Sequence, residues 1–517
     1  MDGRMKRINT YTFTEITFET DNRTSIIEDC CQLLHEETNR TKVLSAFRKN
    51  GRIFAVRMLA EESGHYQYQV DTGDKIMTGE FRADEATGTG KGIVRVKNGD
   101  FYYSDGQKYL PFGTTCYGWI NQDPSLQEQT IQTLAGTCFN KIRMLVFPKF
   151  MPYNREDPKI WPFEKEVGKK WNVNAIVPAF WENLDLRLAQ LRNLGIQADL
   201  ILFHPYDKWG FSELSQEDSI TYIKYCMARF SAYTNIWWSL ANEYEMLLEK
   251  KEQDWDAYGR LLMEKDPYQH LRSIHQIISI FPKRDWMTHC SVQSGNINYL
   301  PKWKKEYGIP VIIDECGYEG DLEFDWGNLS AFEMVHRFWW TVMRGGYCTH
   351  GETFHREDEV LWWGKGGVLY GESEKRIAFL RALLEELPGI GHPVEEQTGD
   401  PNERKEEETA ADRRFRELLE QCEPEMRSGM LDARPKEIRA DSWRLRYYGH
   451  TCPYQTTWTF GKTEGRWKIE QIDVWNMSRK TVIPEAHGKV IIPLTGKEGM
   501  AVLATKQHFT EKIGNGE

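Results

Sequence analysis

The sequence predicts an α/β protein, a (β/α)₈ barrel with one β-sandwich domain before it and another after it. The chain has 517 residues, enough for about three domains of roughly 150 residues each. Between residues 105 and 390, eight apolar strand-like segments alternate with helical patterns. On both sides of that region, apolar and polar residues alternate with the period of two that is typical of strands. We therefore expect domains at 1–100, 101–390 and 435–517, with a linker at 391–434.

The amino-terminal region shows the strand pattern in short segments. Residues 12–18 and 66–70 alternate between apolar and polar side chains, and residues 71–73 form a turn signal. A small β-sandwich is the expected structure of this region.

The central region predicts the barrel. Its eight expected strands lie at 109–114, 141–147, 199–203, 236–240, 271–275, 287–292, 311–314 and 346–350. Clear helical patterns lie at 180–194, 220–233, 331–344 and 374–387. A doubly wound sheet is the alternative, but the first strand is not followed by a glycine-rich phosphate loop. The turn signals Asn98-Gly99 and Asp105-Gly106 indicate a hairpin at the lower mouth of the barrel.

The end of the chain changes character twice. Residues 391–434 are highly charged and contain few strand formers, which predicts a solvated, partly helical linker. Period-two alternation returns at 443–447, 467–472 and 490–494, which predicts the second β-sandwich.

Composition excludes several classes of partner. The formal net charge is -11 and the isoelectric point is about 5.8, so neither nucleic acid nor an anionic membrane is an expected partner. No run of about 18 apolar residues exists. The ten cysteines include no CxxC pair, and no signal peptide is recognisable, so we expect a cytoplasmic protein with reduced thiols. The sandwiches are expected either to bind carbohydrate or to shape the cleft and mediate assembly into a homo-oligomer.

Two glutamates follow apolar strands of the predicted barrel. Glu243 follows the fourth strand, after Asn242, and Glu315 ends the seventh strand. In (β/α)₈ barrels, catalytic groups lie at the carboxyl ends of the strands. A carboxylate at the end of an apolar strand must be paired, solvated in a cleft or chemically active, because its burial alone is costly. Two glutamates facing each other there suit a double displacement at the anomeric carbon of a sugar.

This arrangement resembles the clan-A retaining glycoside hydrolases. The Asn242-Glu243 pair after the fourth strand, with Glu315 after the seventh, is similar to the motif of that clan. The resemblance extends to a cellulase-like or apiosidase-like barrel flanked by two sandwiches, through segments such as YLPFGTTCYGW, DPYQHLRSIH and THGETF. It implies that Glu243 is the acid/base, that Glu315 is the nucleophile, and that Asn242 contacts the sugar 2-hydroxyl.

The electrostatic expectation follows from this pair. Repulsion between two nearby carboxylates should keep Glu243 protonated near neutral pH. A cation should keep Glu315 ionised, and Arg143 on the second strand is our candidate, although a salt bridge inside the barrel is an equal alternative. Asp314 should point away from the interior, toward the helices. If the predicted register is wrong by two residues, Glu245 or Glu319 is the alternative catalytic carboxylate.

Histidines also follow several strands. His204, His275, His289 and His350 follow the third, fifth, sixth and eighth strands. We expect His204 and His350 to bind sugar hydroxyls, whereas for His275 and His289 substrate binding and core packing are equal alternatives. A metal-dependent, amidohydrolase-type barrel is the rival enzyme interpretation and predicts a zinc ion among these imidazoles.

The remaining expected substrate contacts are a carboxylate and four aromatic residues. Glu352 is expected to accept hydrogen bonds from sugar hydroxyls, although the segment from His350 to His355 also has ligand types that suit a metal. Aromatic residues are abundant and suit stacking on sugar rings. The aromatic residues expected at the mouth are Trp119, Trp209, Tyr318 and Trp363.

We therefore predict a retaining glycoside hydrolase that needs no cofactor or metal. Its expected substrate is an oligosaccharide or small glycoside, and the resemblance favours a plant-derived one such as an arabinofuranoside or apioside. Besides the metal-dependent hydrolase, a non-catalytic carbohydrate-binding protein is the other alternative. Glu243 and Glu315 argue against that alternative, because binding alone needs no acid paired with a nucleophile.

Overall fold

The computed structural model describes residues 5–23, 25–86, 90–165, 171–394, 409–423, 434–461 and 465–507. These residues form two compact units. The first unit takes its residues from 1–295, 307–329 and 349–371, and the second from 296–306, 330–348 and 372–517. The first unit contains the amino-terminal domain and every candidate catalytic residue.

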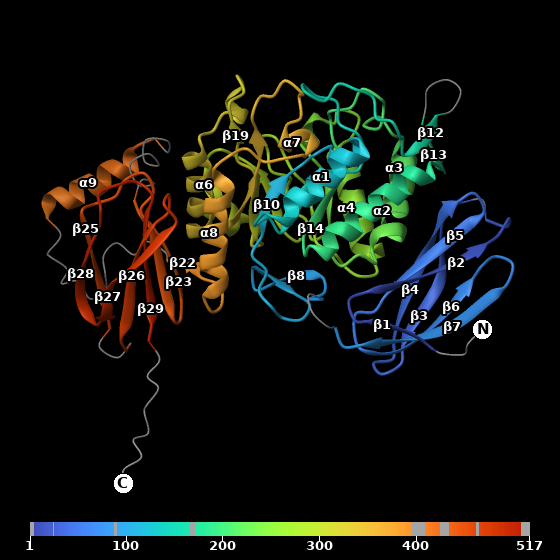
Figure 1. Ribbon diagram of the computed structural model, residues 1–517, viewed down its shortest axis with the longest axis horizontal. Coiled ribbons are helices and arrows are strands. Elements are labelled where there is room, and N and C mark those ends of the chain that lie inside the picture. Colours follow the sequence, from blue (N-terminus) through green and yellow to red (C-terminus); the bar gives the residue numbers. More distant parts are fainter. Residues whose placement is uncertain are drawn as a thin grey trace, which may run out of the picture. The chain divides into compact units, whose positions relative to one another are not determined.

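An eight-stranded sheet forms the barrel (Figure 1). Its strands, in chain order, are β10 (Phe112–Thr115), β11 (Lys141–Leu145), β14 (Gln197–Phe203), β15 (Ile236–Ala241), β16 (Arg272–Ser273), β17 (Cys290–Gln293), β18 (Val311–Glu315) and β20 (Tyr347–His350). The order across the sheet is β16-β15-β14-β11-β10-β20-β18-β17. A parallel bridge between His275 and Ser291 joins the two ends of this order and closes the barrel. The predicted fold class is confirmed.

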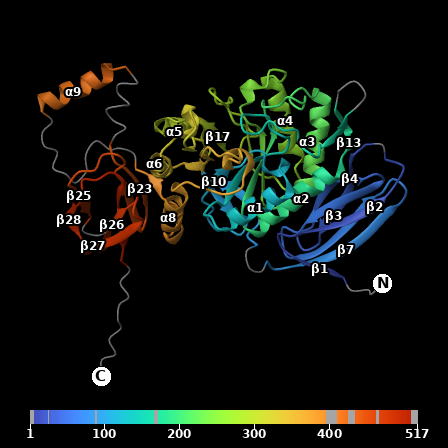
Figure 2. The same cartoon turned by 45° about the horizontal axis from the view of Figure 1, so that its top comes forward.

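Helices alternate with these strands along the chain. They are α1 (Pro124–Ala135), α2 (Pro178–Asn193), α3 (Gln216–Phe230), α4 (Glu252–Lys265), α5 (Leu300–Tyr307), α6 (Ala331–Met343), the short α7 (Trp362–Lys365) and α8 (Ser373–Glu386). Local sequence explains where several of them begin. Proline occupies the first turn of α1 and α2, where its missing N–H has no helical partner to lose. Ser215 and Ser330 cap α3 and α6 by accepting backbone N–H bonds. Figure 2 shows α2, α3 and α4 along the outer side of the barrel strands.

A hairpin covers the amino-terminal end of the barrel, as the two turn signals predicted. It consists of β8 (Val94–Lys97) and β9 (Asp100–Tyr103). Phe101, which is fully buried, stacks on Trp237 with ring centroids 5.4 Å apart, and its edge meets His289 at 5.9 Å. Aromatic side chains therefore fill this end of the barrel, and substrate access is left to the carboxyl ends of the strands.

The amino-terminal domain is rich in β structure. Its strands are β1 (Lys6–Asn9), β2 (Phe13–Glu19), β3 (Ile27–His35), β4 (Arg40–Asn50), β5 (Ile53–Leu59), β6 (Gly64–Asp71) and β7 (Ile76–Asp84). They form one seven-stranded sheet in the order β1-β7-β6-β3-β4-β5-β2. Arg57 on β5 makes two short hydrogen bonds, of 2.6 and 2.8 Å, to Asp185 on α2. This buried ion pair attaches the domain to the barrel within the first unit.

The second unit contains the carboxyl-terminal domain. A six-stranded sheet is built from β22 (His392–Pro393), β23 (Lys436–Ala440), β24 (Trp443–Tyr447), β29 (Met500–Lys506), β26 (Trp467–Asp473) and β27 (Ser478–Ala486), in that order. Strands β25 (Gln455–Phe460) and β28 (Gly488–Pro493) form a separate pair. Both sheets contribute to one apolar core that includes Trp458, Trp467 and Ile492. The β-rich domains on both sides of the barrel are confirmed, and their sandwich arrangement stays a prediction.

Two strand pairs and one helix complete the described strands and α-helices. The pairs β12 (Phe163–Lys165) with β13 (Trp171–Ile176), and β19 (Glu319–Gly320) with β21 (Glu352–Thr353), lie in loops that follow barrel strands. Helix α9 (Ala410–Gln421) falls in the predicted linker, most of which lies outside the described residues. Among the described helices, none combines the length and apolar character that a membrane span requires.

Candidate active site

The two predicted catalytic glutamates lie at the carboxyl ends of two barrel strands, β15 and β18. Glu243 directly follows the residue after β15, and Glu315 is the last residue of β18. Their exposed fractions are only 4 % and 3 %. Carboxylates this deeply buried need hydrogen bonds, cations or protons to compensate for lost hydration.

Glu243 is held in an uncommon backbone conformation. Its φ of +49° and ψ of +57° lie in the left-handed region, which costs a residue with a side chain on the order of 1 kcal/mol. The hydroxyl of Tyr206 donates a hydrogen bond to Glu243 Oε2. The side-chain amide of Gln293, with its nitrogen facing the carboxylate, lies 3.2 Å from Glu243 Oε1. Strain is tolerated here because it aims the carboxylate at these two donors.

Glu315 points into the same space because β18 contains a bulge. Opposite β17, Val292 pairs with Ile313 but Gln293 pairs with Glu315, so Asp314 is an extra residue. A bulge re-aims the side chains that follow it. Asp314 therefore turns into the barrel, where Lys141 Nζ lies 2.6 Å from its Oδ1. Our expectation that Asp314 faces the helices is wrong, since simple alternation takes no account of a bulge.

The two carboxylates share one environment. Gln293 is the strand partner of Glu315, and its side chain reaches Glu243. Burial is the main cause that raises the pKa of the Tyr318 hydroxyl, and the nearby charges of Glu315 and Glu243 raise it further. Donors on opposite sides hold the pair, with Tyr206 at Glu243 and Tyr117 at Glu315.

Burial raises the pKa of Glu315 to about 7, and neighbouring Tyr318 and Trp326 partly offset that increase. The expected cation, Arg143, lies elsewhere. Its guanidinium donates to Asp199 at 3.1 Å, to Ser291 at 3.2 Å and to Asn242 at 3.1 Å, and no bond to Glu315 is found among the described residues. Arg143 therefore forms a salt bridge inside the barrel, which was the alternative expectation. Its contact with the candidate site is the hydrogen bond to Asn242.

Asn242 presents a free donor to the site. Its Oδ1 accepts from Arg143 and lies 3.0 Å from the hydroxyl of Tyr117. These contacts fix the amide orientation, so that Nδ2, which is buried, has no hydrogen-bond partner among the described residues. A buried amide N–H₂ without a partner is poised to donate to a ligand hydroxyl.

Lys149 is a buried cation of the site that the sequence did not indicate. Its Nζ lies 4.0 Å from the ring centroid of Tyr117, 4.2 Å from that of Tyr206 and 5.0 Å from that of Trp363. Burial lowers the pKa of Lys149 to about 7, while the charge of Glu243 acts in the opposite direction. The ammonium group therefore sits between the two phenols whose hydroxyls donate to the two glutamates.

The structure separates the four histidines. His289 precedes β17 and packs against Phe101 and Trp237 at the closed end of the barrel, so it is not part of the site. His275 is buried, and burial with the nearby Arg143 charge lowers its pKa well below the ordinary value. His204 lies with Nε2 3.3 Å from the carbonyl oxygen of Phe147, near Lys149. The predicted zinc cluster of several imidazoles is therefore not assembled among the described residues.

The aromatic residues divide between the site and its surroundings. Trp363 packs on Tyr318 with centroids 5.7 Å apart and lies next to Lys149. Trp209 lines an adjacent cavity of ≈ 630 Å³, whose wall also includes Lys149. Trp119 is buried in a 3₁₀ turn and does not line this cavity. Trp363 is thus the tryptophan best placed to meet a ligand at the glutamates, and Trp209 is placed to meet one extending into the cavity.

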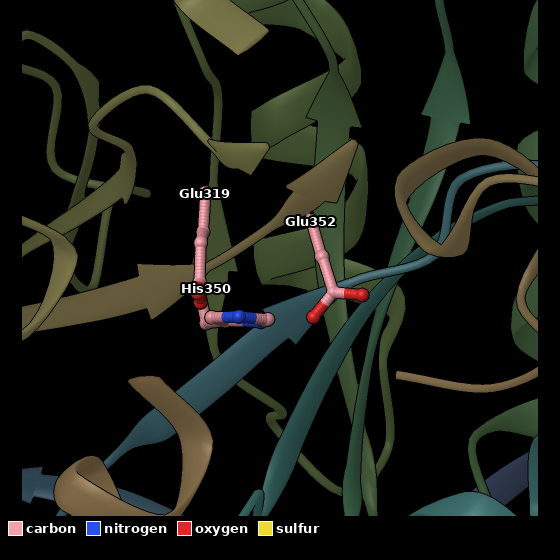
Figure 3. A group of neighbouring side chains, drawn as sticks. All are labelled: Glu319, His350 and Glu352. Atoms are coloured by element: carbon pink, nitrogen blue, oxygen red, sulfur yellow. The ribbon is translucent and has the colours of Figure 1, made fainter. Parts of the chain in front are cut away.

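A second carboxylate group lies just beyond the nucleophile candidate. Glu319, His350 and Glu352 offer ligand atoms that all lie within 4.8 Å of one another (Figure 3). Glu352 accepts hydrogen bonds from the backbone N–H groups of Tyr370 at 2.6 Å and Gly371 at 2.8 Å. Its expected role of binding sugar hydroxyls therefore competes with these internal bonds. Glu245, the other alternative carboxylate, accepts the backbone N–H of Ile277 at 2.6 Å.

Sequence reasoning missed four residues that contact the pair or its donors. Tyr117, Lys149, Tyr206 and Gln293 all lie at or shortly after the carboxyl end of a barrel strand. The same rule that selected Trp119 and His204 applies to Tyr117 and Tyr206, each two residues away. No signal in the sequence distinguishes which member of each loop turns inward.

Comparison with known proteins identifies the family. A family model described as the apiosidase-like catalytic domain matches residues 99–388. The chain belongs to this family of apiosidase-like catalytic domains. Residues 433–505 match a domain of unknown function, DUF5605. No curated protein matches the sequence.

Solved structures agree with the apiosidase-like assignment. A crystal structure provisionally described as a glycoside hydrolase, from Bacteroides vulgatus ATCC 8482, is 28% identical with a TM-score of 0.85. The match covers 97% of this chain and 100% of that one. A family 5 glycoside hydrolase from the same organism, 14% identical with a TM-score of 0.60, covers 81% of this chain and 93% of that one and supports the fold. The apiosidase-like protein is a glycosidase, as the resemblance implied.

Proposed function

We propose that this glycosidase acts with retention of anomeric configuration, by double displacement, with Glu315 as the nucleophile and Glu243 as the acid/base. The observation that carries the proposal is the pair itself. Two buried glutamates at the ends of β15 and β18 share the environment of Tyr318 and the reach of Gln293. Retaining glycosidases use two carboxyl groups about 5–5.5 Å apart on either side of the scissile bond.

In the first step, a carboxylate oxygen of Glu315 attacks the anomeric carbon, and the bond from that carbon to the leaving oxygen breaks. Glu243 gives its proton to the leaving oxygen, so that the aglycone departs as an alcohol. In the second step, Glu243 removes a proton from water, the hydroxide attacks the same carbon, and Glu315 is released. Tyr117 supports Glu315 when it carries charge, because its hydroxyl donates to that carboxylate.

Asn242 and Trp363 position the sugar in this scheme. The free Nδ2 of Asn242 donates to the hydroxyl next to the anomeric carbon, and such bonds strengthen in the transition state. Trp363, partly exposed beside Lys149, offers a face for the sugar ring. The family description supports a substrate with an apiose-like terminal sugar, taken from an oligosaccharide or small glycoside. An arabinofuranoside is the other substrate that the resemblance of the sequence favours.

The first experiment is a panel of aryl glycosides, including apiosides and arabinofuranosides, followed by proton NMR of the anomer that forms first. Retention supports the proposal. An inverted product would contradict it, since inversion requires water to attack where Glu315 is placed.

The second experiment tests the assignment of roles. On the hydrolysed substrate, Glu315→Gly should be inactive, and added azide should give a glycosyl azide of inverted configuration. Glu243→Gly with azide should give a glycosyl azide of retained configuration, because the covalent intermediate still forms. Glu245→Gln is the matched control and should keep most of the activity, because its carboxylate bonds to the backbone of the neighbouring loop. If Glu315→Gly gave the retained azide and Glu243→Gly the inverted one, the two roles would have to be exchanged.

A further inference from the structure

Glu319 and Glu352 face each other on adjacent strands. They are direct partners in the parallel pairing of β19 with β21, and the backbone N–H of Glu319 donates to the carbonyl of Gly351 at 3.0 Å. Each has an exposed fraction of 2 %. Like charges directly opposite each other on paired strands repel, and low solvent exposure strengthens that repulsion. A cation placed between them would turn this repulsion into attraction.

His350 adds a nitrogen ligand to this carboxylate pair. It is fully buried, its Nδ1 lies 3.2 Å from the hydroxyl of Thr114, and its ring stacks on Phe139. Its Nε2 has no hydrogen-bond partner among the described residues. Figure 3 shows the imidazole ring seen edge-on, with the carboxylate of Glu352 beside its tip. Metal-binding histidines commonly have one nitrogen held by a neighbouring polar group and the other directed at the ion.

The surrounding backbone keeps this group in place. Both oxygens of Glu352 accept backbone N–H groups, which leaves each oxygen a further lone pair. A Cβ added at Gly371 would lie 2.4 Å from Glu319 Oε2, so the glycine leaves the room that this carboxylate occupies. Backbone hydrogen bonds and the absence of a side chain at Gly371 therefore fix the positions of these buried carboxylates.

We propose that Glu319, His350 and Glu352 bind one divalent metal ion that links the loop after β18 to the loop after β20. Two carboxylate oxygens and one imidazole nitrogen suit Zn²⁺ or Mn²⁺ better than Mg²⁺ or Ca²⁺, which prefer oxygen ligands. The ion would be structural. It would brace Tyr318, whose ring lies against Gly351 so closely that an added Cβ would be 2.0 Å away.

The test uses the full chain after chelator treatment and dialysis. Metal content is measured after incubation with Zn²⁺ or Mn²⁺, together with the thermal midpoint of unfolding. We expect one equivalent per chain and an upward shift of at least about 2 °C, with smaller shifts for Mg²⁺ and Ca²⁺. Glu319→Gln and Glu352→Gln should each weaken binding at least about 10-fold. His270→Gln is the matched control, since both ring nitrogens of this buried histidine already have partners.

X-ray absorption spectroscopy of the wild-type protein loaded with Zn²⁺ identifies the ligand atoms directly, so the proposal can be tested even if a variant fails to fold. Oxygen and nitrogen ligands with one imidazole are expected. Sulfur ligands would overturn the proposal, because they would place the ion on cysteines. A stoichiometry near zero with no thermal shift would overturn it as well, and so would binding to Glu319→Gln and Glu352→Gln that is as tight as binding to the wild type. None of these readouts depends on glycosidase activity, so their failure would leave the proposed function standing.

Discussion

Asp314 and Glu315 are consecutive residues of β18, yet their environments are opposite. Asp314 accepts from Lys141, Ser291 and Thr349 at 2.6–2.8 Å, and Arg143 lies 3.3 Å away. The charge of Lys141 is the main cause that lowers the pKa of Asp314 against its burial. Burial raises the pKa of Glu315 to about 7, without a cation in contact among the described residues.

This contrast separates, within one strand, a structural carboxylate from the carboxylate that we propose as the nucleophile. Lys141 Nζ also lies 2.8 Å from Asp199, so two cations and two carboxylates balance one another in the barrel interior. Such a group holds strands together but offers no free charge for chemistry. Glu315 is left with a pKa near 7, so it must lose its proton before it can act as the proposed nucleophile.

The largest expected effect is on activity. Glu315→Gln should lower kcat/KM by about 10³-fold or more on any glycoside, and Glu243→Gln should do so on a glycoside with a poor leaving group, because the first variant loses the group that bonds to the sugar and the second loses the proton donor. Initial rates under matched conditions measure this. If Glu315→Gln kept more than a tenth of the wild-type activity, Glu315 would not differ from Asp314 in having a catalytic role.

The next effect is on stability. Asp314→Asn should cost about 3–5 kcal/mol in the free energy of unfolding, because it leaves Lys141 and Arg143 with one buried carboxylate fewer. Chemical denaturation of the variant and of Glu315→Gln measures the difference. Equal stability of the two variants would show that the interior ion group does not hold the barrel.

Glu315→Gln should change the free energy of unfolding in the opposite direction. A carboxyl whose folded pKa is raised binds a proton more tightly in the folded state, so its stabilising contribution is lost as the pH rises from about 4.5 through 7. Above pH 7 the neutral glutamine should therefore stabilise the protein by about 1–3 kcal/mol relative to wild type. The gain should shrink below pH 5, and denaturation at pH 5 and pH 8 checks the sign. A variant less stable than wild type at pH 8 would contradict the raised pKa.

The smallest expected effect concerns Lys149. Lys149→Met should lower kcat/KM by about 10-fold and move the basic limb of the pH–rate profile to higher pH, because the proposed acid/base Glu243 gives up its proton less readily without a cation nearby. Lys149→Arg should restore part of the activity. Lys159→Met is the control, since this exposed lysine lines the same cavity without contacting the phenols. An unchanged pH profile in Lys149→Met would assign Lys149 a packing role only.

The sequence predicted the parts of this account that follow from strand ends. Apolar strands followed by Asn242-Glu243 and by Glu315 were sufficient to predict the barrel and its glutamates. The orientation of Asp314 was not predictable, because a single-residue bulge is invisible to a period-two pattern. For His289, substrate binding and core packing were equal alternatives, and the structure agrees with packing. The sixth strand was predicted to begin at residue 287 but begins at Cys290, which leaves His289 at the closed end.

The surroundings of the glutamates depend on tertiary contacts that no local pattern records. Lys149 lies four residues after β11, and its neighbours Tyr117 and Tyr206 come from two other loops. A buried lysine held by aromatic rings looks, in the sequence alone, like any solvated loop lysine. The expectation that Arg143 neutralises Glu315 also used strand order alone, whereas the folded barrel directs this side chain to Asn242 and Asp199.

The most direct test of the central claim is covalent labelling of the nucleophile. A 2-deoxy-2-fluoro glycoside of the preferred sugar, with a good leaving group, should inactivate the enzyme with time. Peptide mass spectrometry should then place the label on Glu315. A label on Asp314, on Glu243 or on a residue of another strand would contradict the assignment of Glu315 as the catalytic member of the two neighbours.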